Sequence, residues 1–382
     1  MSHWPLVALG EVIDFFDAKR VPLSGMERVS RRGEFPYYGA SGVIDWIDGF
    51  IFDGTYLLIA EDGENLNSRK SPLAFFANGR FWVNNHAHVI RSKPGVLDDA
   101  FLQQWFAQAD IGGYITGAAQ PKLSQANLKR IQFPLPPLTA QRKIAAILSA
   151  YDHLIENNNR RIKLLDEIAQ RIYREWFVDF RYPGHESVPL VPSGLGLIPQ
   201  GWVNGRWGQY ATLDYGRALR GYKDSTGSYP VFGTNGQIGR NDEALFPAGV
   251  IVGRKGAYRG IHLSRDPCWV IDTAFYLRIG YSPIDSMYAY HQLRTVDLDE
   301  IDSGSAIPST SRDAFYAIPI TVPPAPLLQR FASFAWDLDA LQRTLTKGAQ
   351  VLRKTRDLLL PRLLSGEVDV AELDIAMPKV AA

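Results

Sequence analysis

A short polar segment after residue 60 contains the side chains best suited to chemistry. Glu61, Asp62, Glu64 and Lys70 bring three carboxylates and an amine together, the groups that a metal-dependent nuclease uses. A second segment of similar sequence, residues 253–256, reads Gly-Arg-Lys-Gly and keeps none of the acids. A catalytic site common to both segments is therefore not expected, and a polar turn is the preferred interpretation.

Two histidines, His86 and His88, form a His-x-His pair that could ligate a metal ion. Neither a third histidine nor a carboxylate follows at ligand spacing, so a strand with alternating faces is the preferred interpretation. The single cysteine, Cys268, excludes a disulfide framework and the multi-cysteine zinc patterns. We predict no metal site in this chain.

Familiar catalytic motifs are missing from the sequence. There is no Gly-x-x-x-x-Gly-Lys-Ser/Thr phosphate loop, and no Gly-x-Gly-x-x-Gly follows a strand. An Asn-Pro-Pro-Tyr-like tetrapeptide, which could hold a flipped amino group for methylation, is also missing. We predict no catalytic residue and no cofactor bound by this chain.

Charge points to local binding patches. The chain has 41 basic and 40 acidic residues, and residues 1–137 and 182–324 each carry a net charge of −1. Lys and Arg neutralise phosphates, whereas Arg, Asn, Ser and Thr can pair with base edges. Such residues cluster in turns, where plain turn chemistry is the competing interpretation. The predicted DNA contacts are Lys19, Arg20, Ser41, Arg69, Lys70, Asn84, Asn85 and Lys122, followed later in the chain by Arg217, Arg220, Thr234, Asn235, Arg254, Lys255 and Ser309.

Two long helices must position these turns. Residues 139–176 contain no Pro or Gly, and their core-compatible residues recur at alternating spacings of four and three. This period is typical of a helix that packs along another helix. Residues 331–359 continue the period less regularly, with Gly348 and Thr355 in the pattern, and a proline-rich segment precedes each helix. The predicted seam contains Ile144, Leu148, Tyr151, Ile155, Asn158, Ile162, Leu165, Phe331, Leu338, Leu341, Leu345 and Leu352.

The sequence repeats itself. PYYGASGVI at residues 36–44 returns as YPVFGTNGQI at residues 229–238, and GTYLLIAEDG at residues 54–63 returns as PAGVIVGRKG at residues 247–256. Further pairs follow in the same order, which indicates an internal duplication. Gly39, Gly42, Gly233 and Gly236 are expected to shape the shared turn. The residues between them, Ala40-Ser41 and Thr234-Asn235, are expected to distinguish the copies.

The predicted layout alternates α+β globular blocks with long helices. The blocks are residues 1–137 and 181–324, the helices are 138–180 and 325–366, and residues 367–382 form a tail. Short strands between Gly, Pro, Asn and Asp favour α+β over repeating βαβ units. The chain begins without a secretory leader pattern, and no apolar run is long enough to span a membrane. We expect a soluble cytoplasmic protein.

These phrases, in this order, resemble the specificity subunit of type I restriction-modification enzymes. YYGASGVI, LIAEDGEN, NNHAHVI, PKLSQANLKRIQFPLPPLTAQRKIAAIL, GLGLIPQGW and LLPRLLSGEVDV carry the resemblance. It implies that the two blocks are target-recognition domains, each reading half of a split site in double-stranded DNA. It also implies that the helices pair as an antiparallel coiled coil in a pseudo-two-fold particle.

The resemblance further implies partners that hold the catalytic machinery. Two modification subunits would bind the exposed faces of the helices, at residues 139–176 and 328–364, and methylate adenine with S-adenosylmethionine. Restriction subunits would use ATP and Mg²⁺ to translocate and cut DNA. In the family, the specificity subunit itself is not an enzyme.

Two alternatives stay open at this point. One is a two-domain DNA nuclease with an unfamiliar site around residues 61–70, and the other is a scaffold that pairs protein partners without touching DNA. The sequence determines neither the DNA half-sites nor their spacing. It also leaves open which loop residues contact bases rather than phosphates, and whether the complex restricts DNA or only methylates it.

Overall fold

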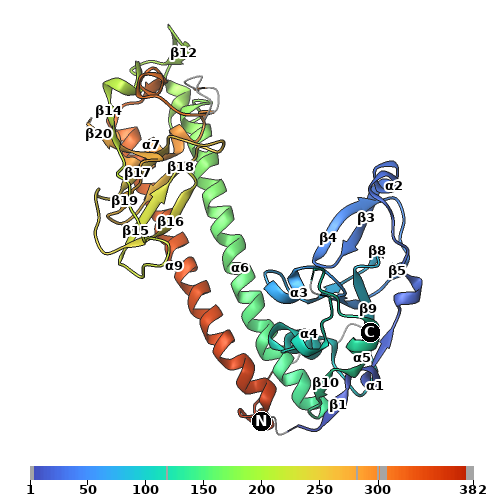
Figure 1. Ribbon diagram of the computed structural model, residues 1–382. Helices are drawn as coiled ribbons and strands as arrows, with labels where there is room; N and C mark the ends of the chain where they lie inside the picture. Colours follow the sequence, from blue (N-terminus) through green and yellow to red (C-terminus); the bar gives the residue numbers. More distant parts are fainter. Residues whose placement is uncertain (1–3, 118, 281–282, 299–300, 302–307, 376–382) are drawn as a thin grey trace. The chain divides into compact units, whose positions relative to one another are not determined.

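The computed structural model describes residues 4–375 except 118, 281–282, 299–300 and 302–307. It divides the chain into two compact units. The first unit contains residues 1–158 and 347–382, and the second contains residues 159–346. Two long helices, α6 (Leu138–Phe177) and α9 (Ala325–Ser365), each contribute one part to each unit (Figure 1).

A four-stranded antiparallel sheet forms the centre of the first unit. Its order is β2-β9-β6-β7. All five residues of β6 are buried, so its apolar run YLLIA is that of a fully covered strand. The strands of this sheet are β2 (Ile13–Phe15), β6 (Tyr56–Ala60), β7 (Ala74–Ala77) and β9 (Ala87–Ser92).

A second sheet of the first unit holds the repeated turn. The strands β3 and β4 form an antiparallel hairpin, and β3 also pairs in parallel with β8. Gly42 closes the hairpin with a φ of 125°, which only glycine adopts without strain. The order is β4-β3-β8-β5, with β3 (Arg32–Gly39), β4 (Gly42–Ile47), β5 (Phe52–Asp53) and β8 (Arg80–Val83).

Short helices and a two-stranded sheet complete the first unit. Asp98 caps the longest of these helices, α4, by accepting a hydrogen bond from the N–H of Phe101. These elements are β1 (Leu6–Ala8), α1 (Leu9–Val12), η1 (Asp17–Lys19), α2 (Gly25–Ser30), α3 (Asn65–Ser68), α4 (Asp99–Gln108), η2 (Gly112–Tyr114), α5 (Gln125–Arg130) and β10 (Gln132–Pro134).

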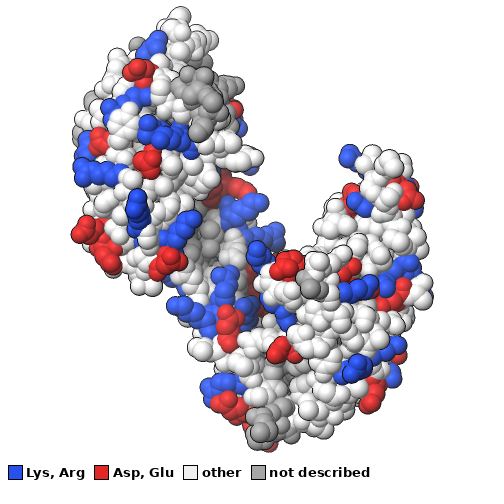
Figure 2. Space-filling model, in the orientation of Figure 1, with Lys and Arg blue, Asp and Glu red and all other residues white. Residues whose placement is uncertain are grey.

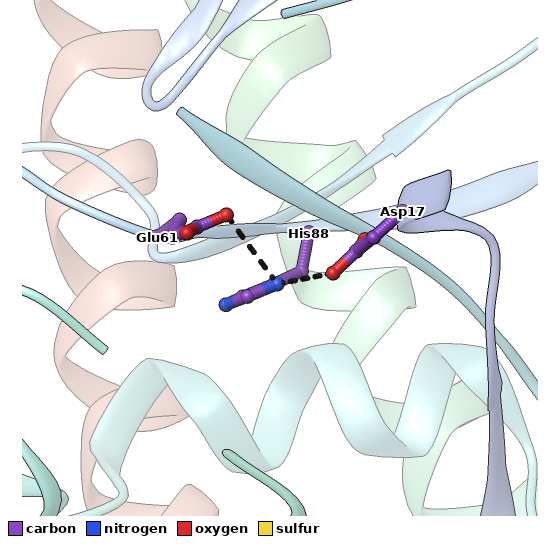
Figure 3. Close-up of side chains that lie close together, drawn as sticks. All are labelled: Asp17, Glu61 and His88. Atoms are coloured by element: carbon purple, nitrogen blue, oxygen red, sulfur yellow. Dashed lines mark hydrogen bonds and ion pairs between the residues drawn. The ribbon is translucent and has the colours of Figure 1, made fainter. Parts of the chain in front are cut away.

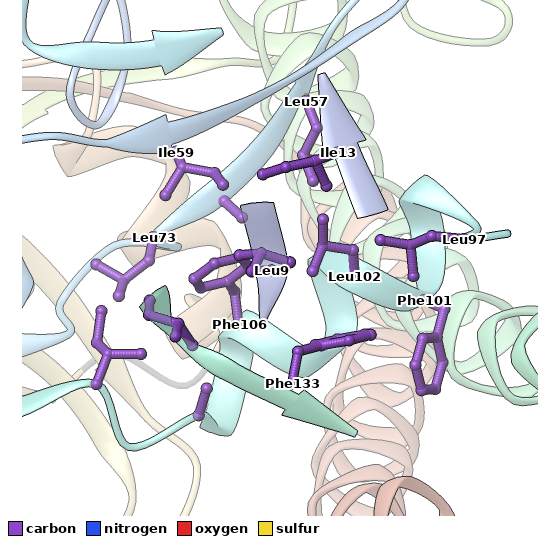
Figure 4. Close-up of a cluster of buried hydrophobic side chains, with 14 of the residues drawn as sticks. Leu9, Ile13, Leu57, Ile59, Leu73, Leu97, Phe101, Leu102, Phe106 and Phe133 are labelled. Atoms are coloured by element: carbon purple, nitrogen blue, oxygen red, sulfur yellow. The ribbon is translucent and has the colours of Figure 1, made fainter. Parts of the chain in front are cut away.

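The main core of the first unit lies between the β2-β9-β6-β7 sheet and these helices. Figure 4 shows Leu9, Leu102 and Phe106 packed below Ile13 and Leu57 of the sheet. The same buried cluster includes residues from both ends of the helix pair: Ile144 and Leu148 of α6, and Leu360, Leu363 and Leu364 of α9. The globular part and its helical part therefore share one apolar core.

The second unit contains sheets with a comparable strand order. Its four-stranded antiparallel sheet is β14-β20-β17-β18, with β14 (Ala211–Tyr215), β17 (Gly249–Gly253), β18 (Ile261–Ser264) and β20 (Ala274–Ile279). The hairpin of β15 (Tyr229–Gly233) and β16 (Gly236–Asn241) also pairs in parallel with β19 (Trp269–Val270). Gly236 closes this hairpin with a φ of 107°.

The remaining elements of the second unit surround an aromatic core. Tyr173 and Phe177 of α6 pack with Tyr288 of α7 and Phe331 of α9. These elements are η3 (His185–Ser187), β11 (Leu190–Ser193), β12 (Gly196–Pro199), β13 (Val203–Arg206), η4 (Trp207–Gln209), α7 (Ser286–Leu293), α8 (Arg312–Tyr316) and β21 (Pro319–Val322).

The helices α6 and α9 pack together within each unit. In the first unit Arg356 Nη1 donates to Asp152 Oδ1 at 2.5 Å. In the second unit Gln342 Nε2 donates to the carbonyl of Ile162 at 3.4 Å. In the second unit Tyr173 of α6 also contacts Phe331 of α9, so residue numbers rise along α6 as they fall along α9 and the two helices run antiparallel there.

One residue of the predicted seam is wrong. Leu341 is 40% exposed, whereas Phe331 and Leu345 are buried. The buried stripe passes instead through Ala335 and Ala349, which are 2% and 4% exposed. These positions hold small alanines. A pattern based on large apolar residues therefore selects residues one position away from the buried face.

The charges on the visible face of each unit are mixed. Figure 2 shows basic and acidic side chains interspersed over the globular parts, with no continuous basic surface. Among the described residues, no helix combines the length and the apolar character needed to cross a membrane.

Candidate nucleic-acid interface

The predicted DNA-contacting turns of the first unit lie at one end of its sheets. The turn 61–64 follows β6 and is tied to a later loop, because Gly63 N–H donates to Pro121 O at 3.0 Å and Leu123 N–H donates to Glu61 O at 2.7 Å. Next to it, His86 Nδ1 lies 2.8 Å from Asp62 Oδ2. The N–H of Asn84 donates to Tyr38 O, which brings the loop after β8 beside the β3–β4 hairpin.

Below the turn 61–64 lies a charged cluster, which we call the acid–histidine network: Asp17, Arg20, Glu61, His88 and Lys122. His88 is fully buried, and its Nδ1 lies 2.7 Å from Asp17 Oδ2 and 3.6 Å from Glu61 Oε2 (Figure 3). Its Nε2 lies 2.8 Å from the carbonyl of Leu123, which can only accept a hydrogen bond. Both ring nitrogens thus face acceptor oxygens.

The network holds the Asp17 side chain as a carboxylate. Burial by itself raises the pKa of Asp17, but the hydrogen bond and charge of His88, the N–H of Val89 and the charge of Arg20 together outweigh it. The pKa of Asp17 therefore lies below its ordinary value. Gln125 Nε2 adds a hydrogen bond of 3.1 Å to Asp17 Oδ2.

Asp17, Glu61 and His88 are also the residues that could hold a metal ion, since one ligand atom from each lies within 4.8 Å of the others. Arg20, however, already supplies the cation. Its Nη1 lies 2.6 Å from Glu61 Oε2 and 2.7 Å from the carbonyl of Ala87. Lys122 Nζ adds a second positive charge 3.3 Å from Glu61 Oε1. The arrangement favours a structural ion network over the metal-dependent nuclease alternative.

The second unit forms the same backbone connections at the end of β17. Gly256 N–H donates to Pro308 O at 3.0 Å, and Thr310 N–H donates to Arg254 O at 2.9 Å. Isolated bridges pair Asp62 with Lys122 in the first unit and Lys255 with Ser309 in the second. Arg254 therefore occupies the position that Glu61 has in the first unit.

The side chains around Arg254 differ completely from the acid–histidine network. Ala60 pairs with Ala87 in the first unit, and Gly253 pairs with Ala274 in the second, so these two pairs are equivalent. The next residue, His88 or Phe275, is therefore also equivalent, and Tyr215 lies opposite Phe275. By this register Tyr215 and Phe275 stand where Asp17 and His88 do. The guanidinium carbon of Arg254 lies 4.8 Å from the ring centroid of Tyr215, and that of Arg312 lies 3.9 Å from it. We call Tyr215, Arg254 and Arg312 the arginine–tyrosine stack.

Three predicted contacts of the first unit serve the fold. Arg20 belongs to the acid–histidine network, and Arg69 donates to the carbonyls of Phe106 and Ala109 at 3.0 and 2.7 Å. Asn84 is 5% exposed, and its side-chain oxygen accepts a hydrogen bond from His86 N–H. Their part in DNA binding stays a prediction.

The other predicted contacts are more accessible. Lys19, Ser41, Lys70, Asn85, Lys122, Arg217, Arg220 and Asn235 are exposed, and Thr234, Arg254, Lys255 and Ser309 are half-buried. Thr234 lies close to the turn after β17, because its carbonyl accepts hydrogen bonds from Gly260 N–H and His262 Nε2. Lys255 Nζ lies 3.7 Å from Asp272 Oδ2.

Sequence reasoning missed Asp17, Tyr215 and Arg312. Asp17 is 71 residues from His88 in the sequence, so no local spacing pattern predicts their contact. The sequence contained a weak signal for Arg312. Ser124 caps α5 and is followed by Gln125, and Ser311 caps α8 and is followed by Arg312. Aligning the two capped helices would have placed Arg312 at the same site.

Comparison with known proteins agrees with this arrangement. Residues 1–167 match the family model described as "Type I restriction modification DNA specificity domain". A putative type I restriction enzyme specificity subunit of Haemophilus influenzae is 37% identical over 142 residues, which are 37% of this chain and 36% of that protein. The MjaIX type I restriction enzyme specificity subunit of Methanocaldococcus jannaschii is 25% identical over 363 residues, covering 83% of this chain and 80% of that protein.

A solved structure shares the fold. The crystal structure of a type I restriction-modification S subunit from M. genitalium superimposes with a TM-score of 0.68 over 95% of this chain and 96% of that one, at 17% sequence identity. The alternation of α+β units and long helices is thus that of a known S subunit. The family model, the relatives and the shared fold all agree with the resemblance of this chain to the type I restriction-modification specificity subunits.

Proposed function

We propose that this chain recognises DNA for a type I restriction-modification complex, with each globular part reading one half of a split double-stranded site. One observation carries the proposal. The turns after β6 and β17 have matching backbone hydrogen bonds, while the side chains on and below them differ in charge and shape. Two domains that recognise different half-sites require such a constant backbone with different side chains in the turns.

We further infer that the two units are copies of one domain joined by a coiled-coil spacer. The equal strand orders and the antiparallel packing of α6 and α9 support this inference. With 40 residues, α6 spans roughly 60 Å at about 1.5 Å per residue. Since DNA rises about 3.4 Å per base pair, such a spacer can separate two readers by more than a helical turn.

Catalysis is assigned to partners. We propose that two modification subunits bind the exposed faces of α6 and α9 and supply S-adenosylmethionine-dependent adenine methylation. Restriction subunits would supply ATP- and Mg²⁺-dependent translocation and cleavage. The described turns support a binding role, because Glu61 and Asp62 are already engaged by Arg20 and His86.

Single-molecule sequencing of the host genome tests the proposal. Methylated adenines should define one bipartite sequence, and its methylation should disappear when the gene is deleted. The purified complex with modification subunits should then bind a duplex carrying that sequence more tightly than a duplex with either half scrambled. The chain alone should transfer no methyl group.

Two results would redirect the proposal. DNA cleavage by the chain alone, lost in Asp62→Ala and Lys70→Ala, would favour the nuclease alternative. A complex that assembles but shifts no duplex would favour the scaffold. Scrambling one half-site at a time provides the internal control, because each half should matter separately.

A further inference from the structure

The arginine–tyrosine stack of the second unit concentrates positive charge on one tyrosine. The guanidinium carbons of Arg254 and Arg312 lie 4.8 and 3.9 Å from the centroid of the Tyr215 ring, so both cations contact the same aromatic ring. Tyr215 is 49% exposed and both arginines are half-buried. The cluster is therefore held in place by the ring and still reaches the surface.

Neither arginine is neutralised within the described part of the chain. Arg254 Nη1 donates to the backbone carbonyl of Asp272 at 3.0 Å, while the carboxylate of Asp272 lies 3.7 Å from Lys255. The Nε of Arg312 is buried and has no hydrogen-bond partner among the described residues. Two partly desolvated cations held at one ring repel each other, and an anion that both can reach relieves that repulsion.

At the equivalent position of the first unit, positive and negative side chains balance each other. There Glu61 stands in place of Arg254, Asp17 in place of Tyr215, and Gln125 in place of Arg312. Arg20 and Lys122 pair with Glu61, so the charges are matched inside the protein. The excess of positive charge at this position is specific to the second unit.

We propose that Arg254 and Arg312 together bind one phosphodiester group of the DNA backbone, with Tyr215 as the surface that orients both. This inference rests on the proposed DNA-binding function. Guanidinium groups bind phosphate through paired N–H donors, and a planar ring that fixes them lowers the entropy lost on binding. The second domain then binds the duplex through a contact with the DNA backbone that the first domain lacks at the equivalent position.

A backbone contact has a distinct signature. It lowers affinity for all sequences alike when removed, and it reduces the slope of log affinity against log salt by about 1. A contact to a base edge instead weakens binding mainly through one base pair.

The test compares Arg312→Gln, which installs the first-unit residue, with Arg278→Gln. Arg278 is exposed in the same unit and pairs with Asp214, with Nη2 at 2.6 Å from Oδ2. Binding of the assembled complex to its cognate duplex and to a scrambled duplex is measured over a series of salt concentrations. We expect Arg312→Gln and Arg254→Gln each to weaken binding about tenfold on both duplexes and to lower the salt slope. Arg278→Gln should change neither value.

A scan with methylphosphonate, which neutralises one phosphate at a time, locates the contact. The wild-type complex should lose affinity at one backbone position of the second half-site, and Arg312→Gln should abolish that sensitivity. An Arg312→Gln complex that assembles normally and binds with unchanged affinity and salt slope would overturn the inference, as would a loss confined to one base pair. A wild-type complex that fails to bind any duplex would instead overturn the proposed function.

Discussion

The ends of β6 and β17 offer two solutions to one structural position. Their backbones are fixed alike, through the pairs Gly63–Pro121 and Gly256–Pro308. Below the first turn, carboxylates and a buried histidine balance two cations; below the second, two arginines lie on a tyrosine. The comparison teaches that the framework is maintained by main-chain hydrogen bonds, which leaves the side chains free to change charge altogether.

Removing Arg20 should have the largest effect on this comparison. Arg20→Ala leaves the buried Glu61 without its 2.6 Å partner, and we expect a loss of about 3 kcal/mol in unfolding free energy. Arg254→Ala removes a cation held by rings and should cost about 1 kcal/mol. Hydrogen exchange of β6 and β17 peptides measures each unit separately. Equal losses of protection would break the comparison.

Acid should act on the first unit through Asp17. Because its folded pKa lies below the ordinary value of 3.8, its contribution is fully present above that pH and is lost as pH falls through the folded pKa. Asp17→Asn should therefore cost about 2 kcal/mol at pH 7 and less at pH 3, measured by urea denaturation. Tyr215→Phe, its positional counterpart, should show no such dependence between these values. A cost that grows toward pH 3 would contradict the assignment.

Alanine substitutions in the two hairpin turns should affect different half-sites of the DNA. Asn235→Ala in the second hairpin should relax the preference at one base pair of one half-site by about 1 kcal/mol. Ser41→Ala should act on the other half-site only. Both residues are exposed, so stability should be unchanged. Binding to duplexes with single base-pair substitutions measures the effect, and relaxation in the same half-site by both variants would contradict the two-reader model.

The smallest effect is expected for Arg254→Lys. The charge is kept, but the planar contact with Tyr215 and Phe275 is lost. Affinity for any duplex should fall about twofold, and the salt slope should stay unchanged. Titration beside Arg254→Gln distinguishes loss of stacking from loss of charge. An effect of Lys as large as that of Gln would show that geometry, rather than charge, dominates at this position.

Local patterns predicted the parts of the fold that depend on local physics. The 3.5-residue period identified the stretch that forms α6, because burial along one helix face repeats within the segment itself. Gly42 and Gly236 marked the hairpin turns, whose positive φ values require glycine. Leu341 was misplaced because the buried face passes through the small residues Ala335 and Ala349, which a pattern drawn through large apolar residues leaves out.

Local sequence patterns were enough to predict the long helices, the repeated hairpins and the resemblance to a family. The side chains that surround these elements became known only from the folded arrangement. His88 meets Asp17 and Glu61 across three separate segments, and Arg254 and Arg312 each contact the ring of Tyr215. Such contacts depend on how strands and loops distant in sequence are brought together. Spacing along the chain carries no record of them, whereas helical periods and turn glycines are fixed by neighbours a few residues away.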